Sequence, residues 1–193
     1  MAMHSHMVPL GTPLPDVTLP DLAGQPVRLI DYAAGEPLVV IFLANHCPYV
    51  RHIEHRLAQV FDAFEGTGVR FIAISSNDVT THPDDDAAGL ASQIERTGWR
   101  FPYLMDEDQT AAKAFHAACT PDFFVFDAQG QLAYRGSFDA STPKNGNPVN
   151  GKHLRDAVTK VLLDKPVPEP QPPSMGCGIK WKPGNEPEAI TFV

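Results

Sequence analysis

The chain has 193 residues and a formal net charge of -8 at pH 7, with 43% hydrophobic and 20% charged residues. That length suits one domain with a buried core and is short for two. The acidic balance argues against a nucleic-acid partner, which requires clustered Lys and Arg, and favours small molecules or proteins as partners.

No apolar run in the sequence is long enough to cross a membrane, and residues 1–7 lack the charged and apolar regions of a signal peptide. We therefore expect a cytoplasmic protein without a membrane partner. The three cysteines, Cys47, Cys119 and Cys177, are too few and too scattered for a secreted disulfide framework or a C-x-x-C zinc site. Because their number is odd, at least one thiol is free or is shared between alternative partners.

The N-terminal region 11–35 is rich in proline and glycine. Within it, residues 16–19 and 26–30 alternate weakly between apolar and polar side chains on either side of a turn at 23–25, a pattern that predicts a β-hairpin. Residues 37–44 then form a short apolar run with β-branched members, which predicts a strand buried on both faces.

Cys47 lies where this strand gives way to helical spacing. Pro48 suits the first helical position, where its missing N–H costs nothing, and this places Cys47 at or beside the N-cap. There the free amides of the first turn and the positive end of the helix dipole can stabilise a thiolate. Cys47 is therefore the candidate nucleophile. The alternative is an inert buried thiol, because free cysteine is among the most buried residue types.

The helix predicted after Pro48 has an apolar stripe and a polar face. The stripe consists of Val50, Ile53, Leu57, Val60, Phe61 and Phe64. His52, Glu54, His55 and Arg56 lie largely off it, so we interpret them as a solvated face. A metal carrier that uses Cys47 with His46 or His52 is a weaker hypothesis, because these side chains supply too few convergent ligands.

The rest of the body alternates between apolar strands and amphipathic helices, which predicts an α/β sheet. Three acids at 84–86 start one helix, and capping with dipole compensation explains them better than a metal cluster does. A turn at 127–131 predicts that the strands on either side of it are antiparallel. The predicted strands are 69–74, 101–104, 123–126 and 132–136, and helices are expected after 83–86, at 110–116 and at 151–164.

Beyond Lys165 the composition changes, and prolines between 166 and 173 predict an extended spacer. Cys177 follows between two glycines. Ile179 and Trp181 then alternate with lysines, a pattern that suits an edge strand or an apolar clip against the body. We therefore divide the chain into a domain, 11–164, and a Pro-rich C-terminal tail, 165–193.

Taken together, these motifs resemble the thioredoxin fold, and most closely a peroxiredoxin-like branch of the alkyl hydroperoxide reductase and thiol-specific antioxidant superfamily. The resemblance implies a central mixed sheet flanked by helices, with an N-terminal β-hairpin and an extended tail. It is carried by the motifs at 45–50, 76–78, 119–124, 134–136 and 176–182, and it covers nearly the whole chain from Gly11 onward.

By this resemblance, Cys47 takes the place of the nucleophile and Pro121 that of a cis-proline facing it. The residues implied to bind substrate are Asn45, His46, Pro48, Thr120 and Pro121. We expect no metal and no cofactor.

Several positions depart from the family pattern. Val50 stands where thioredoxin has its second cysteine, which excludes exchange within a single C-x-x-C motif. Ala44 replaces the threonine of typical peroxiredoxins, so the peroxide-binding hydroxyl is missing, and Val40 replaces a proline of the same motif. The typical peroxiredoxin arginine before the late strand is also unmatched at 120–122.

The leading hypothesis is an antioxidant or thiol-disulfide enzyme whose Cys47 thiolate attacks a peroxide oxygen or a disulfide sulfur. Cys119 or Cys177 would resolve the product, and a thiol reductant such as a thioredoxin-like protein would restore both thiols. Cys119 lies two residues before Pro121 and needs little motion, whereas about twelve residues of extended spacer reach roughly 37 Å and can deliver Cys177. A binding module without turnover is the alternative of a different class. The oligomeric state is not predicted.

Overall fold

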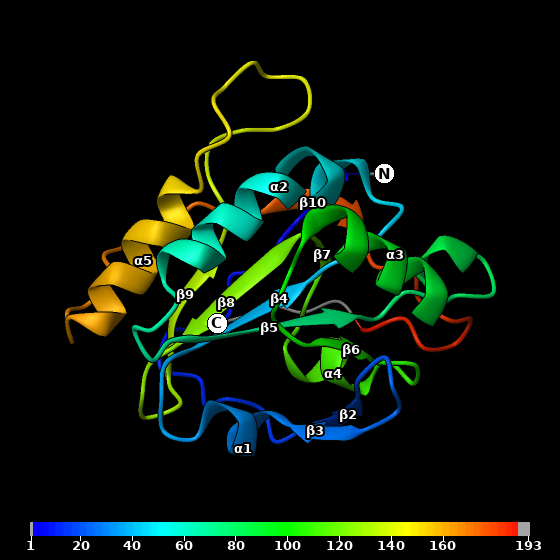
Figure 1. Ribbon diagram of the computed structural model, residues 1–193, viewed down its shortest axis with the longest axis horizontal. Helices are drawn as coiled ribbons and strands as arrows, with labels where there is room; N and C mark the ends of the chain where they lie inside the picture. The colour runs from blue at the N-terminus through cyan, green and yellow to red at the C-terminus, as the bar shows by residue number, and fades with distance from the viewer. Residues whose placement is uncertain (1, 189–193) are drawn as a thin grey trace.

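The computed structural model describes residues 2–188, and its centre is a five-stranded mixed sheet (Figure 1). Its strands are β4 Leu38–Phe42, β5 Arg70–Ser75, β6 Tyr103–Met105, β8 Asp122–Phe126 and β9 Leu132–Gly136, in the order β6-β5-β4-β8-β9. Strands β4, β5 and β6 are parallel, whereas β8 is antiparallel to β4 and β9 is antiparallel to β8. The predicted α/β class, the mixed sheet and the antiparallel pair around 127–131 are confirmed.

Helices cover both faces of this sheet (Figure 1). They are α1 Leu29–Ala33, α2 Pro48–Ala63, α3 Ala87–Thr97, α4 Thr110–Ala114 and α5 Lys152–Leu162, with a 3-10 turn at Pro83–Asp85. Val39 and Ile41 of β4 face the layer of α2, α3 and α5, while Leu38, Val40 and Phe42 face the layer of α1 and α4. All five side chains are fully buried, so the predicted burial of this strand on both faces is confirmed. This burial holds in place the C-terminal end of β4, after which the chain continues into α2.

The N-terminal hairpin forms from β2 Thr18–Pro20 and β3 Pro26–Arg28, which pair antiparallel. The Asp21 carboxylate accepts hydrogen bonds from the amides of Ala23 and Gln25, both at 2.9 Å, and closes the turn. The prediction that the second strand extends to residue 30 is wrong, because α1 already begins at Leu29.

A second, three-stranded sheet joins three distant parts of the chain. Its members are β1 Ala2–His4, β10 Met175–Gly178 and β7 Cys119–Thr120, and β10 lies in the middle, antiparallel to both neighbours. The suggestion of an edge strand at 179–182 is therefore wrong: the strand lies at Met175–Gly178, before that segment, and is the middle strand of its sheet. The apolar-clip alternative fits that segment, since Ile179 is buried and Trp181 packs in the layer of α1 and α4.

The tail reaches β10 along the edge of β9. The Gln171 side chain accepts from the backbone amide and the guanidinium of Arg135 at 3.1 and 2.8 Å and donates to the Ala133 carbonyl at 3.0 Å. Just beyond Arg135, the Ser137 amide donates to the Pro172 carbonyl at 2.9 Å, and the Ser174 hydroxyl donates to the Gly136 carbonyl. Residues 165–174 contain no helix, as predicted, and these bonds hold part of the spacer against the sheet.

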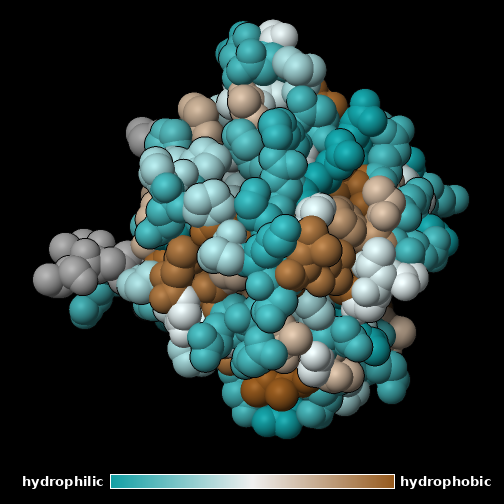
Figure 2. Space-filling model, turned by 90° about the vertical axis from the view of Figure 1, so that its left-hand side faces the viewer, coloured by the Kyte–Doolittle hydropathy of each residue, from teal (hydrophilic) through white to brown (hydrophobic). Residues whose placement is uncertain are grey.

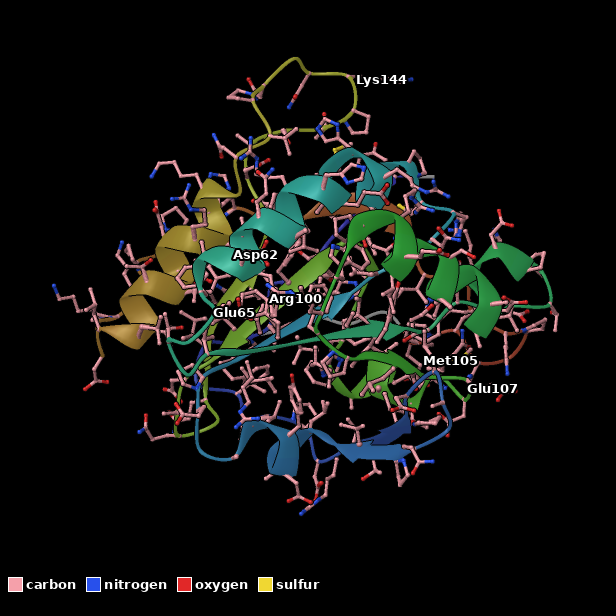
Figure 3. All side chains as sticks on the ribbon, viewed as in Figure 1. Asp62, Glu65, Arg100, Met105, Glu107 and Lys144 are labelled. Atoms are coloured by element: carbon pink, nitrogen blue, oxygen red, sulfur yellow. The ribbon has the colours of Figure 1, made fainter. Side chains whose placement is uncertain are left out.

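The polar face predicted for α2 is partly wrong. Glu54 is only 4% exposed, because α3 packs over this side of α2. The guanidinium of Arg96 in α3 donates two hydrogen bonds of 3.0 Å to the Glu54 carboxylate. A comparable pairing at the surface, Arg100 with Asp62 and Glu65, lies in the open (Figure 3). The helical spacing of apolar residues identifies the stripe of α2 that faces the sheet. It does not indicate that a second helix, here α3, covers another side of α2.

The face of the molecule in Figure 2 is mostly hydrophilic, and its apolar residues gather in separate patches. Within residues 2–188, no helix combines the length and the apolar character needed to cross a bilayer.

Candidate active site

Cys47 is the N-cap of α2, and Pro48 occupies the first helical turn, as the sequence predicts. The Cys47 carbonyl accepts the first helical hydrogen bond from the Arg51 amide at 2.9 Å. The residue is 0% exposed, and its Sγ donates to the carbonyl oxygen of Thr120 at 3.1 Å. The thiol therefore lies between the start of a helix and the loop that joins β7 to β8, where helix amides can stabilise a sulfur anion.

The Thr120–Pro121 peptide bond is cis, which confirms the prediction for Pro121. Thr120 presents its backbone carbonyl to Cys47. Its hydroxyl oxygen is buried and has no hydrogen-bond partner, and the same is true of Oδ1 of Asp122, one residue beyond the proline. Burial raises the pKa of Asp122 well above its ordinary value.

Cys177 reaches the same place from the tail. In the pairing of β10 with β7, Cys177 stands opposite Thr120, the residue whose carbonyl contacts Cys47. Burial, followed by the interaction with Cys47, raises the pKa of Cys177 to about 12. Cys177 consequently keeps its proton at neutral pH.

Gly176 explains how the tail comes so close. A Cβ atom at this position would lie 2.1 Å from the carbonyl oxygen of Thr120, a distance that no side chain can occupy. Glycine therefore permits β10 to lie directly against the cis-proline loop.

Cys119 is also fully buried, but its thiol points elsewhere. Its Sγ lies 3.7 Å from the Pro121 carbonyl oxygen. Burial, followed by the proximity of Asp122, Cys47 and Cys177, raises the pKa of Cys119 well above its usual value. All three thiols are free, and the pKa shifts of Cys119 and Cys177 show that each of them lies close enough to Cys47 to interact with it.

Asp85 is a residue of this site that the sequence did not reveal. Its carboxylate is 0% exposed and accepts from the backbone amides of Asn45 and His46 at 2.7 and 3.1 Å, from His46 Nδ1 at 2.5 Å and from Asn77 Nδ2 at 2.8 Å. Burial by itself would raise the pKa of Asp85, but the hydrogen bonds from His46 and Asn77 outweigh it and the pKa is lowered. The carboxylate is thus ionised and fixes His46, the residue before Cys47.

The capping role predicted for the acids at 84–86 is correct for Asp86, whose carboxylate accepts from the Gly89 amide at 2.8 Å and caps α3. It is wrong for Asp85. The 3-10 turn that precedes α3 directs that side chain inward, and nothing in a run of three consecutive acids distinguishes the one that turns toward the core.

The predicted substrate-binding residues surround the thiol unequally. His46, Pro48, Thr120 and Pro121 adjoin Cys47 in sequence or contact its loop, whereas the side chain of Asn45 is occupied elsewhere. Its Nδ2 donates to the carbonyls of Asp84 and Gly89 at 2.9 and 3.0 Å, and its Oδ1 accepts from Arg51 and Arg96 at 3.1 and 3.0 Å. Asn45 therefore links the start of α2 to α3, and its predicted role toward substrate stays a prediction.

Among residues 2–188, no three His, Cys, Asp or Glu side chains converge on a position that could hold a metal ion. His52, the more remote of the two proposed histidine ligands, has its Nε2 3.1 Å from the Ser141 hydroxyl. The metal-carrier hypothesis thus gains no support from the described part of the chain.

Comparison with known proteins decides the family. The model of the AhpC/TSA family matches residues 10–135. The chain belongs to the AhpC/TSA family. This confirms the suspected superfamily and the predicted class of enzyme, a thiol-dependent oxidoreductase, and a binding module without turnover is not favoured.

Among curated proteins, the thiol-disulfide oxidoreductase ResA of Geobacillus thermodenitrificans is 25% identical over 126 residues, which is 65% of this chain and 67% of ResA. An uncharacterized conserved protein from Geobacillus kaustophilus, of known structure, is 44% identical with a TM-score of 0.92, and the match covers 95% of this chain and 98% of that one. A hypothetical protein from Sinorhizobium meliloti 1021 is 41% identical with a TM-score of 0.91, covering 94% and 99%. Both matches extend far beyond residue 135.

A secreted disulfide oxidoreductase of Mycobacterium tuberculosis has a TM-score of 0.58 at 21% identity and covers 75% of this chain and 95% of its own. At that identity the likeness shows the fold alone, and it confirms the predicted thioredoxin-like architecture.

Proposed function

We propose that this AhpC/TSA-family protein is a thiol-disulfide oxidoreductase in which Cys47 is the nucleophile and Cys177 the resolving thiol. The observation that carries the proposal is the pairing of β10 with β7, which sets Cys177 opposite Thr120, the residue whose carbonyl oxygen accepts from Cys47 Sγ. The relatives named as thiol-disulfide oxidoreductases support disulfides as the substrate class.

In the first step, the Cys47 thiolate attacks one sulfur of a substrate disulfide. A bond to Cys47 forms as the substrate S–S bond breaks, and one substrate thiolate leaves and takes up a proton. In the second step, Cys177 loses its proton and attacks the Cys47 sulfur, so that the Cys47–Cys177 disulfide forms and the second substrate thiol leaves. The substrate gains two electrons, and the two protein thiols lose them.

The environment of Cys177 favours this order of events. Before the first step, the Cys47 sulfur contributes to the raised pKa of Cys177, which remains protonated. Once Cys47 is in a mixed disulfide, its negative charge is gone, so the Cys177 thiol gives up its proton more readily and attacks. A thiol reductant such as a thioredoxin-like protein then reduces the Cys47–Cys177 bond and restores both thiols.

A peroxide is the second candidate substrate, because complete burial of Cys47 favours a small oxidant over a large one. Attack of the thiolate on the O–O bond gives a sulfenic acid and an alcohol or water, and Cys177 then displaces water to form the same disulfide. Ala44, with no hydroxyl group to bind the peroxide, counts against an efficient peroxidase or antioxidant role.

Single-turnover oxidation tests the assignment. The reduced protein receives one equivalent of an aromatic disulfide with a coloured thiol product, or one equivalent of hydrogen peroxide, and peptide mapping locates the new bond. We expect a Cys47–Cys177 bridge in the wild type and in Cys119→Ser, a persistent mixed disulfide or sulfenic acid in Cys177→Ser, and no reaction in Cys47→Ser. A Cys47–Cys119 bridge, or unchanged chemistry in Cys47→Ser, contradicts the proposal.

We also propose a cytoplasmic location, because a reducing compartment keeps such thiols reduced and ready to act on a disulfide. Fractionation of the native host tests this, and recovery of the protein outside the cytoplasm would overturn it.

A further inference from the structure

The tail is fastened to the body just after the strand that carries Cys177. The backbone amide of Lys180 donates to Oδ1 of Asn77 at 2.8 Å, and the Lys180 carbonyl accepts from the Asp78 amide at 2.8 Å. Asn77 follows the end of β5 and is 6% exposed. These bonds tie the tail to the sheet three residues beyond Cys177.

The nitrogen of the Asn77 side-chain amide contacts the residues that hold the start of α2, next to Cys47. Its Nδ2 donates to Oδ2 of Asp85 at 2.8 Å, the same oxygen that accepts from His46 Nδ1. A carboxylate only accepts hydrogen bonds, and a backbone amide only donates, so the two ends of Asn77 cannot be exchanged. One side chain therefore connects the residue before Cys47 to the segment after Cys177.

We propose that Asn77 is a positioning residue that sets the Cys177 thiol against Cys47, and this inference rests on the proposed function. The bridge His46–Asp85–Asn77–Lys180 has a buried centre and a fixed orientation, so it places the tail relative to the start of α2. Strand pairing with β7 orients β10, and Asn77 fixes where the segment that follows it lies. Resolution of a mixed disulfide depends on such placement, since a shift of about 1 Å in a reacting group can slow a reaction by roughly 100-fold.

Gln109 also holds this segment but does not make the same link. Its side chain donates to the Lys180 carbonyl at 2.9 Å and accepts from the Lys182 amide at 2.8 Å. Its remaining bonds go to the Ser76 carbonyl and to Asn185, and none of these partners belongs to the His46–Asp85 pair. Gln109 anchors the tail to the start of α4, whereas Asn77 anchors it to the nucleophile.

The aromatic disulfide separates the two chemical steps, because each step releases one coloured thiol. We expect Asn77→Ala to slow the second release, which reports Cys177, by about tenfold or more, and to change the first release, which reports Cys47, by less than about threefold. The matched control is Ser76→Ala, which removes one buried hydrogen bond, to Asp106 at 2.7 Å, at the adjacent position and should leave both rates unchanged.

Lys180→Pro provides a second variant in case Asn77→Ala folds poorly. It deletes the amide hydrogen that Asn77 accepts, and Lys180→Ala, which loses the same ammonium group but keeps the amide, is its matched reference. Relative to Lys180→Ala, Lys180→Pro should slow the second release in the same way. Equilibration with a glutathione redox buffer gives an independent measure. The constant for forming the Cys47–Cys177 disulfide should fall about tenfold in both variants, which equals about 30 mV for a two-electron couple.

Unchanged second release in both variants would overturn the inference. Equal slowing of both releases would also overturn it, because Asn77 would then support the fold of the whole site rather than the position of Cys177. A wild type with no release at all, or with no Cys47–Cys177 bridge, would overturn the proposed function and the inference with it.

Discussion

The start of α2 and the C-terminal tail each bring one cysteine to the same point, but they do so by different means. Cys47 is placed by its immediate neighbours, a fully buried strand before it and Pro48 after it. Cys177 is placed by residues distant in sequence, since β10 pairs with β1 on one side and with β7 on the other. The nucleophile is thus specified locally, whereas its partner thiol depends on tertiary contacts.

This difference bears on stability as well as on position. The strand before Cys47 lies at the centre of the main sheet, and opening it requires breaking the core. β10 has four residues, two of them glycine, and is held chiefly by backbone pairing and a few polar contacts. Segments with little buried apolar surface open at a lower free energy than the core. We therefore expect β10 to separate from β7 while the start of α2 remains folded.

The largest effect should follow from breaking the locally specified side. In Asp85→Asn, an amide replaces a carboxylate that accepts four hydrogen bonds, so its NH₂ group must face donors. Disrupting a buried charged network of this kind costs about 3–5 kcal/mol. Urea unfolding at pH 7 should show a loss of this size, and a loss below about 1 kcal/mol would show that Asp85 contributes little.

We expect the difference in unfolding free energy between wild type and Asp85→Asn to depend on pH. The pKa of Asp85 is lower in the folded protein than its ordinary value of 3.8, so its stabilising contribution is complete above that value and disappears as the pH falls through the folded pKa. The difference in unfolding free energy between wild type and Asp85→Asn should shrink as the pH falls below about 4. Other carboxyl groups titrate in both proteins and cancel in this difference.

The sequence predicted the side that is locally specified. The change from an apolar strand to helical spacing placed Cys47 at the N-cap, and the Thr-Pro motif before β8 placed the cis bond through the family resemblance. Both features depend on consecutive residues. The prediction that Cys177 can reach Cys47 rested on the length of the spacer and left Cys119 open as an alternative.

Two features of the site were beyond the sequence for a physical reason. The segment Met175–Gly178 has low intrinsic strand propensity because of its glycines, and it is a strand because two partner strands supply its hydrogen bonds. Asp85 differs from its two acidic neighbours only in the direction that the 3-10 turn gives its side chain. The family match to residues 10–135 also ends before the tail, so it does not indicate a second thiol there.

An intermediate effect should come from Gly176→Ala, which prevents β10 from packing against β7. The new Cβ would lie 2.1 Å from the Thr120 carbonyl oxygen, so β10 must move away from β7 at a cost of about 1–3 kcal/mol. We expect the Lys180–Trp181 bond to be cleaved by trypsin about tenfold faster and the bridge between Cys47 and Cys177 to form more slowly.

Gly178→Ala is the matched control in the same strand. There the nearest atom to a new Cβ is the Met3 sulfur at 2.7 Å, the end of a flexible side chain that can move aside. It should behave like the wild type in both assays. If the two alanine variants behave alike, contact with the β7 backbone does not determine where the tail lies.

The smallest effect on the chemistry should come from the upstream end of the tail. Gln171→Ala removes the three hydrogen bonds that this buried side chain makes to Arg135 and Ala133, at a local cost of about 1–3 kcal/mol. Amide hydrogen exchange around 133–136 and 171–173 should therefore accelerate, while exposed Gln129→Ala leaves exchange there unchanged. The rate of Cys47–Cys177 bond formation should change less than about twofold, because Ser174, β10 and Lys180 still hold the segment that carries Cys177. A fall of tenfold would instead mean that the tail docks as one cooperative unit, and the contacts nearest Cys177 would not be sufficient to place it.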